Sequence, residues 1–362
     1  MTPDRALAGP GESTVGGAFH RARRSAWLRR LVLLVVAALV TVVVVRLVGR
    51  IDWAAVYDAL RHLTWWQPFV LLAVVVVRQV LNALPLALYI PRVSALRATV
   101  NDLGAILMSA VAPPPSDLAL RVGMFNSWGV PTVQAVAGTL MNTLTFYIVR
   151  FAAPLLGFVL LLAVEEPAGL RWLDLAFVAI AVAILVAVLL VVRSDQLAVR
   201  VGSFSGRMAR KVRRSVDPDA WVRACVDFRV QISARFRYGF VRSLLALCGM
   251  LAADLTVLVL SLRFVGVSSS EVALVYVAIA YLFAYPFTLF PFSGLGIVDA
   301  LVLAAVVEAG GLEVEAAAVA GLVVWRVFTV AVPILMGLGA VTAWRRGWLG
   351  DVPPEAESPS VG

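Results

Sequence analysis

The sequence predicts an all-α fold, an integral membrane bundle of about eight crossing segments with re-entrant or broken helices. The chain of 362 residues is 61% hydrophobic and 15% charged, and its mean hydropathy is +0.92. This composition is typical of a polytopic membrane protein and excludes an ordinary soluble domain. Apolar runs of about 20 residues, the length that crosses a bilayer, recur along the chain.

A third observation is an internal repeat. The segment Pro114–Ala119 reads Pro-x-Ser-x-Leu-small, and so does Pro291–Gly296, 177 residues later. Each segment has an intramembrane charge 36 or 37 residues before it and an Arg 36 or 35 residues after it. These flanking charges are Arg78 and Asp254 upstream, and Arg150 and Arg326 downstream. Matched Pro/Gly-interrupted segments in two halves are typical of inverted-repeat transporters, in which the site lies between the halves.

The first elements follow from charge and hydropathy. Residues 1–25 have no apolar periodicity and are predicted to be a disordered, basic cytoplasmic tail. Leu31–Val48 follows a cluster of Arg and is predicted to be a first span with its N-terminus inside. Trp65–Ile90 is the second span, although Arg78 interrupts it. Residues 101–128 are too polar for a full span, so a re-entrant hairpin is expected.

The rest of the first half, about 65–165, ends in one long apolar run. Thr132–Val164 would reach about 50 Å as a helix, against about 30 Å of hydrocarbon. It is therefore expected to tilt, or to bend near Gly138 or Pro154. A span at 172–192 then returns the chain to the inside.

Residues 193–242 form a polar loop with a net charge of +8. This excess predicts a cytoplasmic loop. After Asp219, apolar residues recur at helical spacing, which predicts an amphipathic helix on the membrane surface. Two interpretations stay open: the loop attracts anionic lipid headgroups, or it only anchors the topology between the repeats.

The second half, about 243–346, repeats the pattern. Its expected segments are Ser243–Leu262, Val272–Phe290, a half-span Ile297–Val307, and Ala316–Trp344. The transmembrane domain thus covers 26–346, and residues 347–362 form a second disordered tail. Arg345 and Arg346 place the C-terminus inside, so both termini are predicted to be cytoplasmic.

Several chemistries find no support in the sequence. Two His and two Cys give no metal cluster, and there is no phosphate-binding loop of the GxxxxGK[ST] type. No nucleophile–base set is recognisable, so no cofactor and no catalytic residue are predicted. The positive charge is concentrated in one loop, which indicates topology and argues against nucleic-acid binding.

The charges inside apolar segments are the candidates for function. A charge at mid-bilayer costs about 2.5–3.5 kcal/mol on insertion scales. Arg–Asp pairs that only hold helices together are the alternative explanation. The residues concerned are Arg78, Arg150, Asp254, Asp299 and Arg326, with Asp117 and Arg121 beside the first interrupted segment. Four Arg face three Asp, so one guanidinium is expected to lack an acid and to suit a phosphate.

The interrupted segments add smaller candidates. Ser116 and Ser293 offer polar lining, and Gly294 and Gly296 are expected where backbone approaches backbone or ligand closely. Gly296→Leu should then be more damaging than Gly310→Leu in the turn that follows.

These residues also resemble a known family. The stretch PFSGLGIVDALVLAAV, followed by Trp325-Arg326, resembles the flippase-like transmembrane domain of lysylphosphatidylglycerol synthases, and PPPSDLALRVGMFNSWGVP resembles its first-half loop. Asp299 stands where that family usually has Glu, and Asp117 where Gly is common. After Arg346 only 16 residues follow, too few for the family's soluble aminoacyl-transferase domain, so lipid lysylation is not implied for this chain.

The resemblance implies a lipid-handling domain in a prokaryotic plasma membrane. The leading hypothesis is ATP-independent translocation of an anionic or polyisoprenyl-linked lipid between leaflets. Arg150 and Arg326 would hold the headgroup phosphate, Arg121 would assist, and Asp254 and Asp299 would orient the arginines. The alternatives are a non-transporting accessory subunit of cell-envelope glycolipid assembly and, ranked lower, an intramembrane transferase. The partners expected are a membrane lipid and anionic headgroups at 193–242, and a homodimer stays open.

Overall fold

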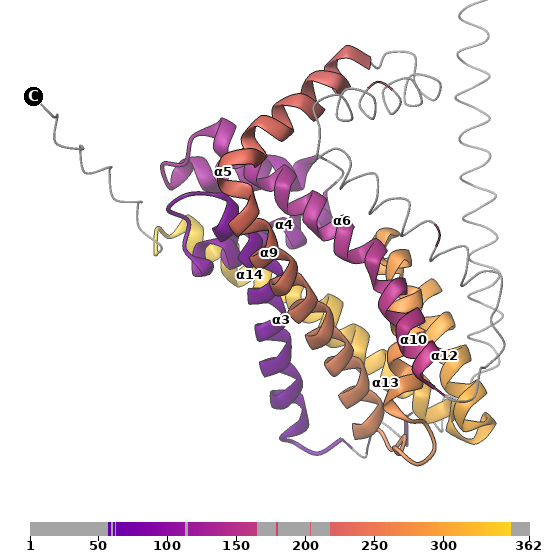
Figure 1. The fold of residues 1–362 in the computed structure, drawn as a ribbon. Coiled ribbons are helices and arrows are strands. Elements are labelled where there is room, and N and C mark those ends of the chain that lie inside the picture. The colour runs from indigo at the N-terminus through magenta and orange to yellow at the C-terminus, as the bar shows by residue number, and fades with distance from the viewer. Residues whose placement is uncertain are drawn as a thin grey trace, which may run out of the picture. The chain divides into compact units, whose positions relative to one another are not determined.

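The computed structural model describes residues 63–112, 115–164 and 218–348, with isolated residues at 57, 58, 61, 179 and 203. The described residues form helices and short connections, with no strand among them (Figure 1). The predicted all-α class is therefore confirmed. The elements are α3 (Gln67–Tyr89), α4 (Ala95–Val111), α5 (Ser116–Ser127), α6 (Thr132–Ala163), α9 (Pro218–Phe264), α10 (Leu274–Ala284), η1 (Tyr285–Leu289), α11 (Pro291–Gly294), α12 (Ile297–Gly310), η2 (Leu312–Val314), α13 (Glu315–Arg326), η3 (Val327–Ala331) and α14 (Val332–Arg345).

Four helical segments of this part of the chain are long and apolar enough to cross a bilayer. They are Gln67–Tyr89, Thr132–Ala163, Gly239–Phe264 and Leu312–Arg345, with 23, 32, 26 and 34 residues. Each coincides with a predicted span. The predicted span at 31–48 lies outside the described residues. So do nearly all of the span at 172–192, residues 193–202 and 204–217 of the loop, the N-terminal tail and residues 349–362, so the total of eight stays a prediction.

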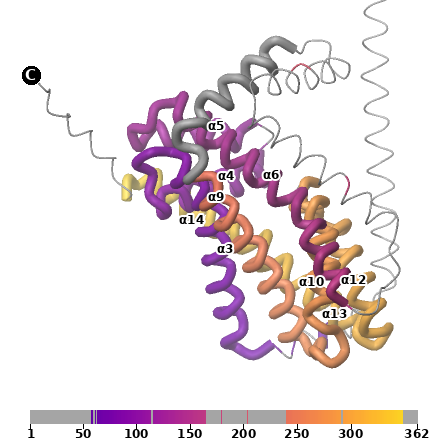
Figure 2. Tube along the Cα trace, viewed as in Figure 1, coloured from indigo at the N-terminus to yellow at the C-terminus, as the bar shows by residue number. Residues whose placement is uncertain are grey.

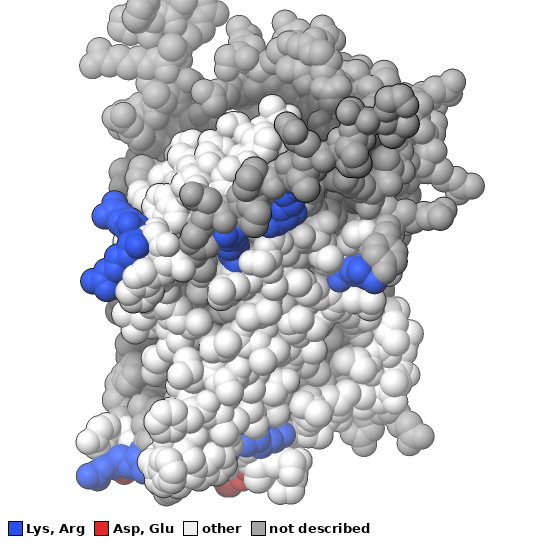
Figure 3. Space-filling model, turned by 90° about the vertical axis from the view of Figure 1, so that its left-hand side faces the viewer, with Lys and Arg blue, Asp and Glu red and all other residues white. Residues whose placement is uncertain are grey.

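The apolar character of the surface agrees with a membrane location. On the face drawn in Figure 3, charged side chains lie at two levels, and a broad uncharged band separates them. Many large apolar side chains are exposed on the spans, among them Phe69, Val159, Leu162, Leu245 and Leu335. In water such exposure would be costly, whereas lipid tails provide an apolar surrounding for it.

The two halves share one order of elements and run in opposite directions. Helices α3 and α9 pack side by side and antiparallel, since Trp66 contacts Phe264 at one end and Tyr89 lies beside Gly239 at the other. The hairpin of α4 and α5 lies at one end of α6, and the α10–α12 segment lies toward its other end (Figure 2). This is the arrangement expected for an inverted repeat.

The contact between α4 and α14 has an equivalent in the opposite orientation, between α10 and α6. Helix α4 packs on α14, where Gly337 lies against Leu103, and α10 packs on α6, where Gly157 lies against Phe283. In each contact a glycine lets a neighbouring helix approach closely, as is usual in membrane bundles. A separation of 180 residues relates Gly157 to Gly337 and Leu103 to Phe283. The two contacts are therefore equivalent by the internal repeat.

The second interrupted segment breaks the helix where the prolines predict it. Helix α10 tightens into the 3₁₀ turn η1, and α11 is a single turn that begins at Pro291. Ser293, Gly294 and Gly296 then adopt positive φ angles of 57°, 68° and 86°. Asp299 restarts the helix as α12, because its Oδ2 accepts a hydrogen bond of 2.6 Å from the Gly296 N–H. An acceptor at this place satisfies a backbone donor that the helix start leaves open.

The last span contains a feature that the sequence analysis did not predict. The predicted single helix from 316 to 344 is interrupted by the π-helical turn η3, which begins directly after Arg326. The Val332 N–H donates to the Val327 carbonyl five residues back. Pro333 explains the location, because proline has no N–H for the carbonyl four residues before it. Such turns are frequent at functional sites.

Helix α9 also differs from the prediction. The amphipathic helix expected after Asp219 is present, but it continues without a break into the following span and forms one helix of 47 residues. A lone helix on the membrane surface, separate from the span, is therefore not what the structure shows at this point. Contact of this segment with lipid headgroups stays a prediction.

One glycine expectation needs a correction. Gly310 is not a permissive reference position, because a Cβ there would lie 2.7 Å from Cγ2 of Val272. Gly294 is the tight position in the interrupted segment, where a Cβ would lie 2.4 Å from the Phe287 carbonyl oxygen. Leu295 between the two glycines is 56% exposed. A permissive reference has to come from elsewhere in the chain.

We expect the α4–α14 contact to depend on Gly337. A Cβ at this position would lie 2.5 Å from the Leu103 carbonyl oxygen, whereas nothing lies within 4 Å of a Cβ at Gly339 in the same helix. Gly337→Ala should therefore lower the free energy of unfolding by about 1–3 kcal/mol, the usual cost of overpacking. Gly339→Ala should leave it unchanged or raise it by up to about 1 kcal/mol, because alanine favours a helix. Thermal unfolding of both variants in detergent measures the difference, and equal midpoints would contradict the close packing.

Candidate functional site

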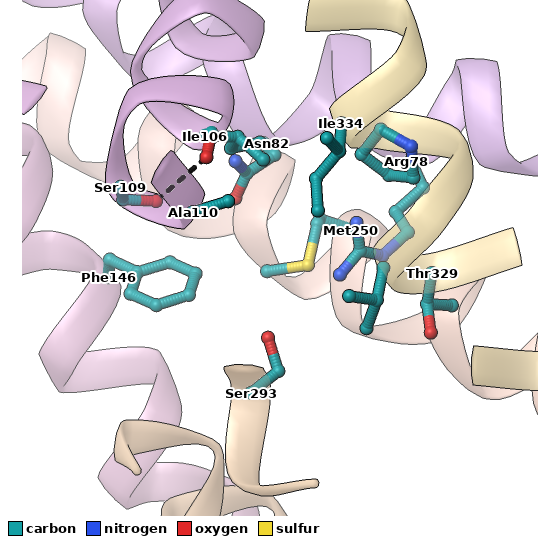
Figure 4. A pocket seen from close by; sticks show the side chains of 12 residues that line it. Arg78, Asn82, Ile106, Ser109, Ala110, Phe146, Met250, Ser293, Thr329 and Ile334 are labelled. Atoms are coloured by element: carbon teal, nitrogen blue, oxygen red, sulfur yellow. Dashed lines mark hydrogen bonds between the residues drawn. The ribbon is translucent and has the colours of Figure 1, made fainter. Parts of the chain in front are cut away.

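A cavity of about 410 Å³ lies between the two halves. Its lining comes from α3, α4 and α6 of the first half and from α9, α11, η3 and α14 of the second. Figure 4 shows Ser293 projecting toward it from α11, with Phe146 on one side and Arg78 and Thr329 on the other. We call this space the central cavity. Its position between the halves is where an inverted repeat places a substrate site.

A smaller cavity of about 50 Å³ adjoins the central cavity. The two share four lining residues, namely Arg78, Phe146, Ser293 and Thr329. Arg150 and Arg326 both line the smaller space, together with Arg78 and Asp254. We call it the arginine cavity. The structure thus brings together four of the charges that the hydropathy pattern singled out, and it places the two repeat-related arginines at one cavity.

The first ion pair joins the two halves. Arg78 on α3 donates from Nε to Oδ1 of Asp254 on α9 at 3.0 Å. Its Nη1 donates to the Gln79 side chain, and Tyr281 donates to Oδ2 of Asp254 at 2.7 Å. The Asp254 residue is 4% exposed. Because Arg78 and Asp254 occupy equivalent places in the repeat, the pair lies where the pseudo-two-fold axis passes between α3 and α9.

The second ion pair lies within the second half. Arg326 at the end of α13 donates from Nε to Oδ1 of Asp299 at 2.6 Å, and from Nη1 to the Ser293 carbonyl at 3.1 Å. Its guanidinium carbon lies 4.4 Å from the ring centre of Trp325. Its buried Nη2 has no hydrogen-bond partner among the described residues. Arg326 therefore keeps one guanidinium nitrogen that is not hydrogen-bonded to any described residue.

The third ion pair involves a residue that the sequence analysis missed. Arg121 on α5 donates to Oδ1 of Asp102 on α4 at 2.6 Å, and Asn82 on α3 donates to Oδ2 at 2.7 Å. The sequence analysis counted Asp117 as the third acid. Asp117 is partly exposed and forms no ion pair with another described residue. The buried Asn101-Asp102 pair inside an otherwise apolar helix was the signal that identifies Asp102.

Arg150 differs from the other three arginines. It forms no ion pair with any described residue, and its buried Nε has no hydrogen-bond partner there. Its guanidinium carbon lies 4.5 Å from the ring centre of Phe146 and 5.6 Å from that of Tyr147. Aromatic faces attract a cation but do not neutralise it. In the repeat, the counterpart of Asp299 is Val122, so the first half has no acid at the matching place.

The two interrupted segments contribute unequally to the cavities. Ser293 lines both of them, while Gly294 and Gly296 shape the backbone beside it. Ser109 and Ala110, near the end of α4 and just before the first interrupted segment, line the central cavity. Neither cavity is lined by Ser116, Asp117 or Arg121. The described part of the first segment thus does not line either cavity, and substrate binding by Ser116, Asp117 and Arg121 stays a prediction. Helix α5 keeps Ser116 and Asp117 in its first turn, away from the lining.

A comparison with known protein families identifies the family of this chain. The sequence pattern of the family described as the lysylphosphatidylglycerol synthase TM region matches residues 31–337. The chain belongs to this family. The resemblance read from the stretch that begins at Pro291 is thereby confirmed. No curated protein and no solved structure gave a significant match.

The match reaches into both halves, and residues 31–337 include Arg150 and every residue of the three ion pairs. Membership is consistent with a membrane protein related to membrane lipids. Among the described residues, no group of three His, Cys, Asp or Glu is arranged to hold a metal ion. The described residues around the two cavities of this lysylphosphatidylglycerol synthase-type domain present guanidinium groups, a carboxylate, hydroxyls and aromatic rings.

We expect the Arg78–Asp254 pair to hold α3 and α9 together. Asp254→Asn leaves a buried, uncompensated guanidinium, which should cost about 3–5 kcal/mol of stability. Arg78→Gln combined with Asp254→Asn removes both charges and should be less unstable than the sum of the single variants. A thermal double-mutant cycle in detergent measures the coupling, and Arg61→Gln on the surface serves as a control. Strict additivity of the two single effects would show that the pair does not act as a unit.

Proposed function

We propose that this domain moves an anionic or polyisoprenyl-linked lipid between the leaflets of a prokaryotic plasma membrane without hydrolysing ATP. The observation that carries the proposal is Arg150, a guanidinium without an acid at a cavity between two inverted halves. A buried charge without a partner is costly, so a ligand that supplies the acid gains binding energy from it.

The second arginine supports the same ligand. Arg326 lines the same cavity and retains the unpaired donor Nη2. Guanidinium groups bind phosphate oxygens by two parallel hydrogen bonds, which is the strong form of charge-assisted bond. Asp299 holds Arg326 in position through Nε. In this proposal the headgroup phosphate is held by Arg150 and Arg326, and Asp254 and Asp299 orient the side chains around it.

The remaining lining suits a headgroup attached to an apolar tail. Ser109, Asn82 and Ser293 offer polar groups to the central cavity, while Ile106, Val330 and Ile334 offer apolar contact. The volume of the central cavity, about 410 Å³, falls in the range of small-ligand sites, about 300–1,000 Å³. The acyl or isoprenyl chains of the lipid would remain in the bilayer beside the uncharged band.

The alternative is a non-transporting accessory subunit of cell-envelope glycolipid assembly. Three of the four central arginines are paired with acids, and this feature suits a purely structural polar centre. Arg150 argues for the lipid ligand, because a structural centre gains nothing from an uncompensated charge. We propose no catalytic step for the chain. Both termini and the basic loop at 193–242 are placed in the cytoplasm in this proposal.

We expect Arg150→Lys to impair lipid transfer severely. Lysine keeps the charge but loses the planar two-point geometry, and one charged hydrogen bond is worth about 1.5–3 kcal/mol, or roughly 10- to 100-fold. Arg326→Lys should act in the same direction, because the Asp299 contact and the Nη2 donor both depend on the guanidinium. The assay is leaflet transfer of labelled lipids in proteoliposomes, with a panel of headgroups.

The exposed Arg61, which lies over Tyr57 and away from both cavities, provides the matched control as Arg61→Lys. All three variants must first show wild-type expression and thermal stability. Transfer at the wild-type rate in both cavity variants would refute the phosphate site. Absence of transfer of every lipid by the wild-type protein would favour the accessory subunit.

A further inference from the structure

The polar centre between the halves carries one more positive than negative side chain. Among the described residues it holds three arginines and two aspartates, and each aspartate pairs with one arginine. The pairs are Arg78–Asp254 and Arg326–Asp299, while the pair Arg121–Asp102 lies within the first half and is neutral in itself. Arg150 is the remaining cation. The net charge of this centre is therefore one positive unit.

This single unit sets a condition on the ligand. Charges in a low-dielectric interior interact strongly, and any net charge left there is expensive. A ligand with one negative charge brings the centre to neutrality. A phosphodiester has one ionisable oxygen and carries one charge, whereas a phosphomonoester carries about −1.5 to −2 at pH 7. A monoester or diphosphate would replace an excess of positive charge by an excess of negative charge.

From this balance, and resting on the proposed function, we infer that the site selects lipids by headgroup charge. The geometry points to a singly charged phosphodiester lipid as the ligand, in preference to lipid phosphomonoesters and diphosphates. The proposed function includes both anionic lipids and polyisoprenyl-linked lipids. The inference favours phospholipid-type ligands over polyisoprenyl phosphates.

The free donors agree with the same ligand. A phosphodiester has two non-bridging oxygens. Arg150 and Arg326 both line the arginine cavity, and each has one buried guanidinium nitrogen, Nε and Nη2 respectively, without a hydrogen-bond partner among the described residues. The arginine cavity is small, about 50 Å³, and Phe146 and Tyr147 surround Arg150 with aromatic faces. Hydroxyl groups of Thr288, Ser293 and Thr329 also line this cavity, so the preference for the diester rests on its charge and not on the number of donors.

Two substitutions change the charge of the centre in opposite directions. Phe146→Glu places a carboxylate one helical turn before Arg150, where an acid four residues ahead of a cation pairs with it well. Because the guanidinium already lies 4.5 Å from the Phe146 ring centre, the new acid is within reach. Phe146→Gln introduces a side chain of nearly the same shape as glutamate but without its charge. Asp299→Asn raises the net charge to two positive units and keeps an oxygen that can accept from the Gly296 N–H.

The test measures lipid binding to the purified full chain in detergent by native mass spectrometry. The probes share their acyl chains: phosphatidylmethanol as the diester, phosphatidic acid as the monoester and phosphatidylcholine as the neutral lipid. The wild-type protein should bind phosphatidylmethanol at least about fivefold more tightly than either other lipid, a difference of about 1 kcal/mol. Phe146→Glu should abolish this preference, Phe146→Gln should keep the order of the three lipids, and Asp299→Asn should shift the ratio toward phosphatidic acid.

Three results would overturn the inference. They are tighter binding of phosphatidic acid than of phosphatidylmethanol by the wild-type protein, an unchanged lipid order in Phe146→Glu, and an unchanged ratio in Asp299→Asn. Thermal unfolding identifies any variant that fails to fold. If the Phe146 variants fail, the ratio measured for Asp299→Asn tests the inference alone. Soluble dimethyl phosphate at the lipid concentration should displace little lipid; full displacement would overturn the lipid part of the inference.

The preference for a singly charged lipid and the proposed function of lipid transfer can be refuted independently of each other. A protein that prefers phosphatidylmethanol but moves no lipid in proteoliposomes retains the charge rule and loses the proposed function. A protein that moves all three lipids without any difference in binding retains the proposed function and loses the charge rule.

Discussion

The need to neutralise charge inside an apolar helix pair is the constraint on which this structure depends. Helix α3 and the part of α9 from Gly239 to Phe264 are each long enough to span a bilayer, and each has a charged residue deep within it. These residues, Arg78 and Asp254, meet at 3.0 Å, so neither helix can face lipid alone at that level. Because the two positions are equivalent in the repeat, one contact joins the halves and fixes their antiparallel register. The α4–α14 and α6–α10 contacts then complete the bundle around this pair.

The halves share a scaffold but not a charge pattern. Gly157 and Gly337 serve the same packing role in opposite orientations, and the interrupted segments occupy corresponding places. The acids do not follow the repeat: Asp299 pairs with Arg326 in the second half, while Val122 stands at the matching place in the first. The first half instead uses Asp102 for Arg121. A symmetric scaffold thereby holds an asymmetric site, with one arginine that no side chain of the described part neutralises.

Hydropathy and proline spacing were sufficient to predict much of this arrangement. The four long spans, the break at Pro291 and the inward-facing charges all follow from the cost of placing charge or free backbone groups in lipid. Partner identity could not be predicted, because pairing depends on which helix faces lie together. Asp102 was therefore missed and Asp117 was counted in its place. The π turn after Arg326 and the tight contact at Gly310 could not be predicted from the sequence either, since both depend on neighbouring side chains in space.

The charge left over by these pairs has an electrical consequence. Moving one elementary charge through a membrane potential changes its energy by about 2.3 kcal/mol per 100 mV. In the described part of the chain, the polar centre carries one positive unit when it is empty, and a bound monoanion, as proposed, would reduce this to none. Under the proposed function, a rearrangement that moves the centre across the field would then be driven by the voltage in the empty protein and insensitive to it in the loaded one. In a cell with a negative interior, the voltage would favour the empty site on the inner side and leave the loaded step to the lipid gradient.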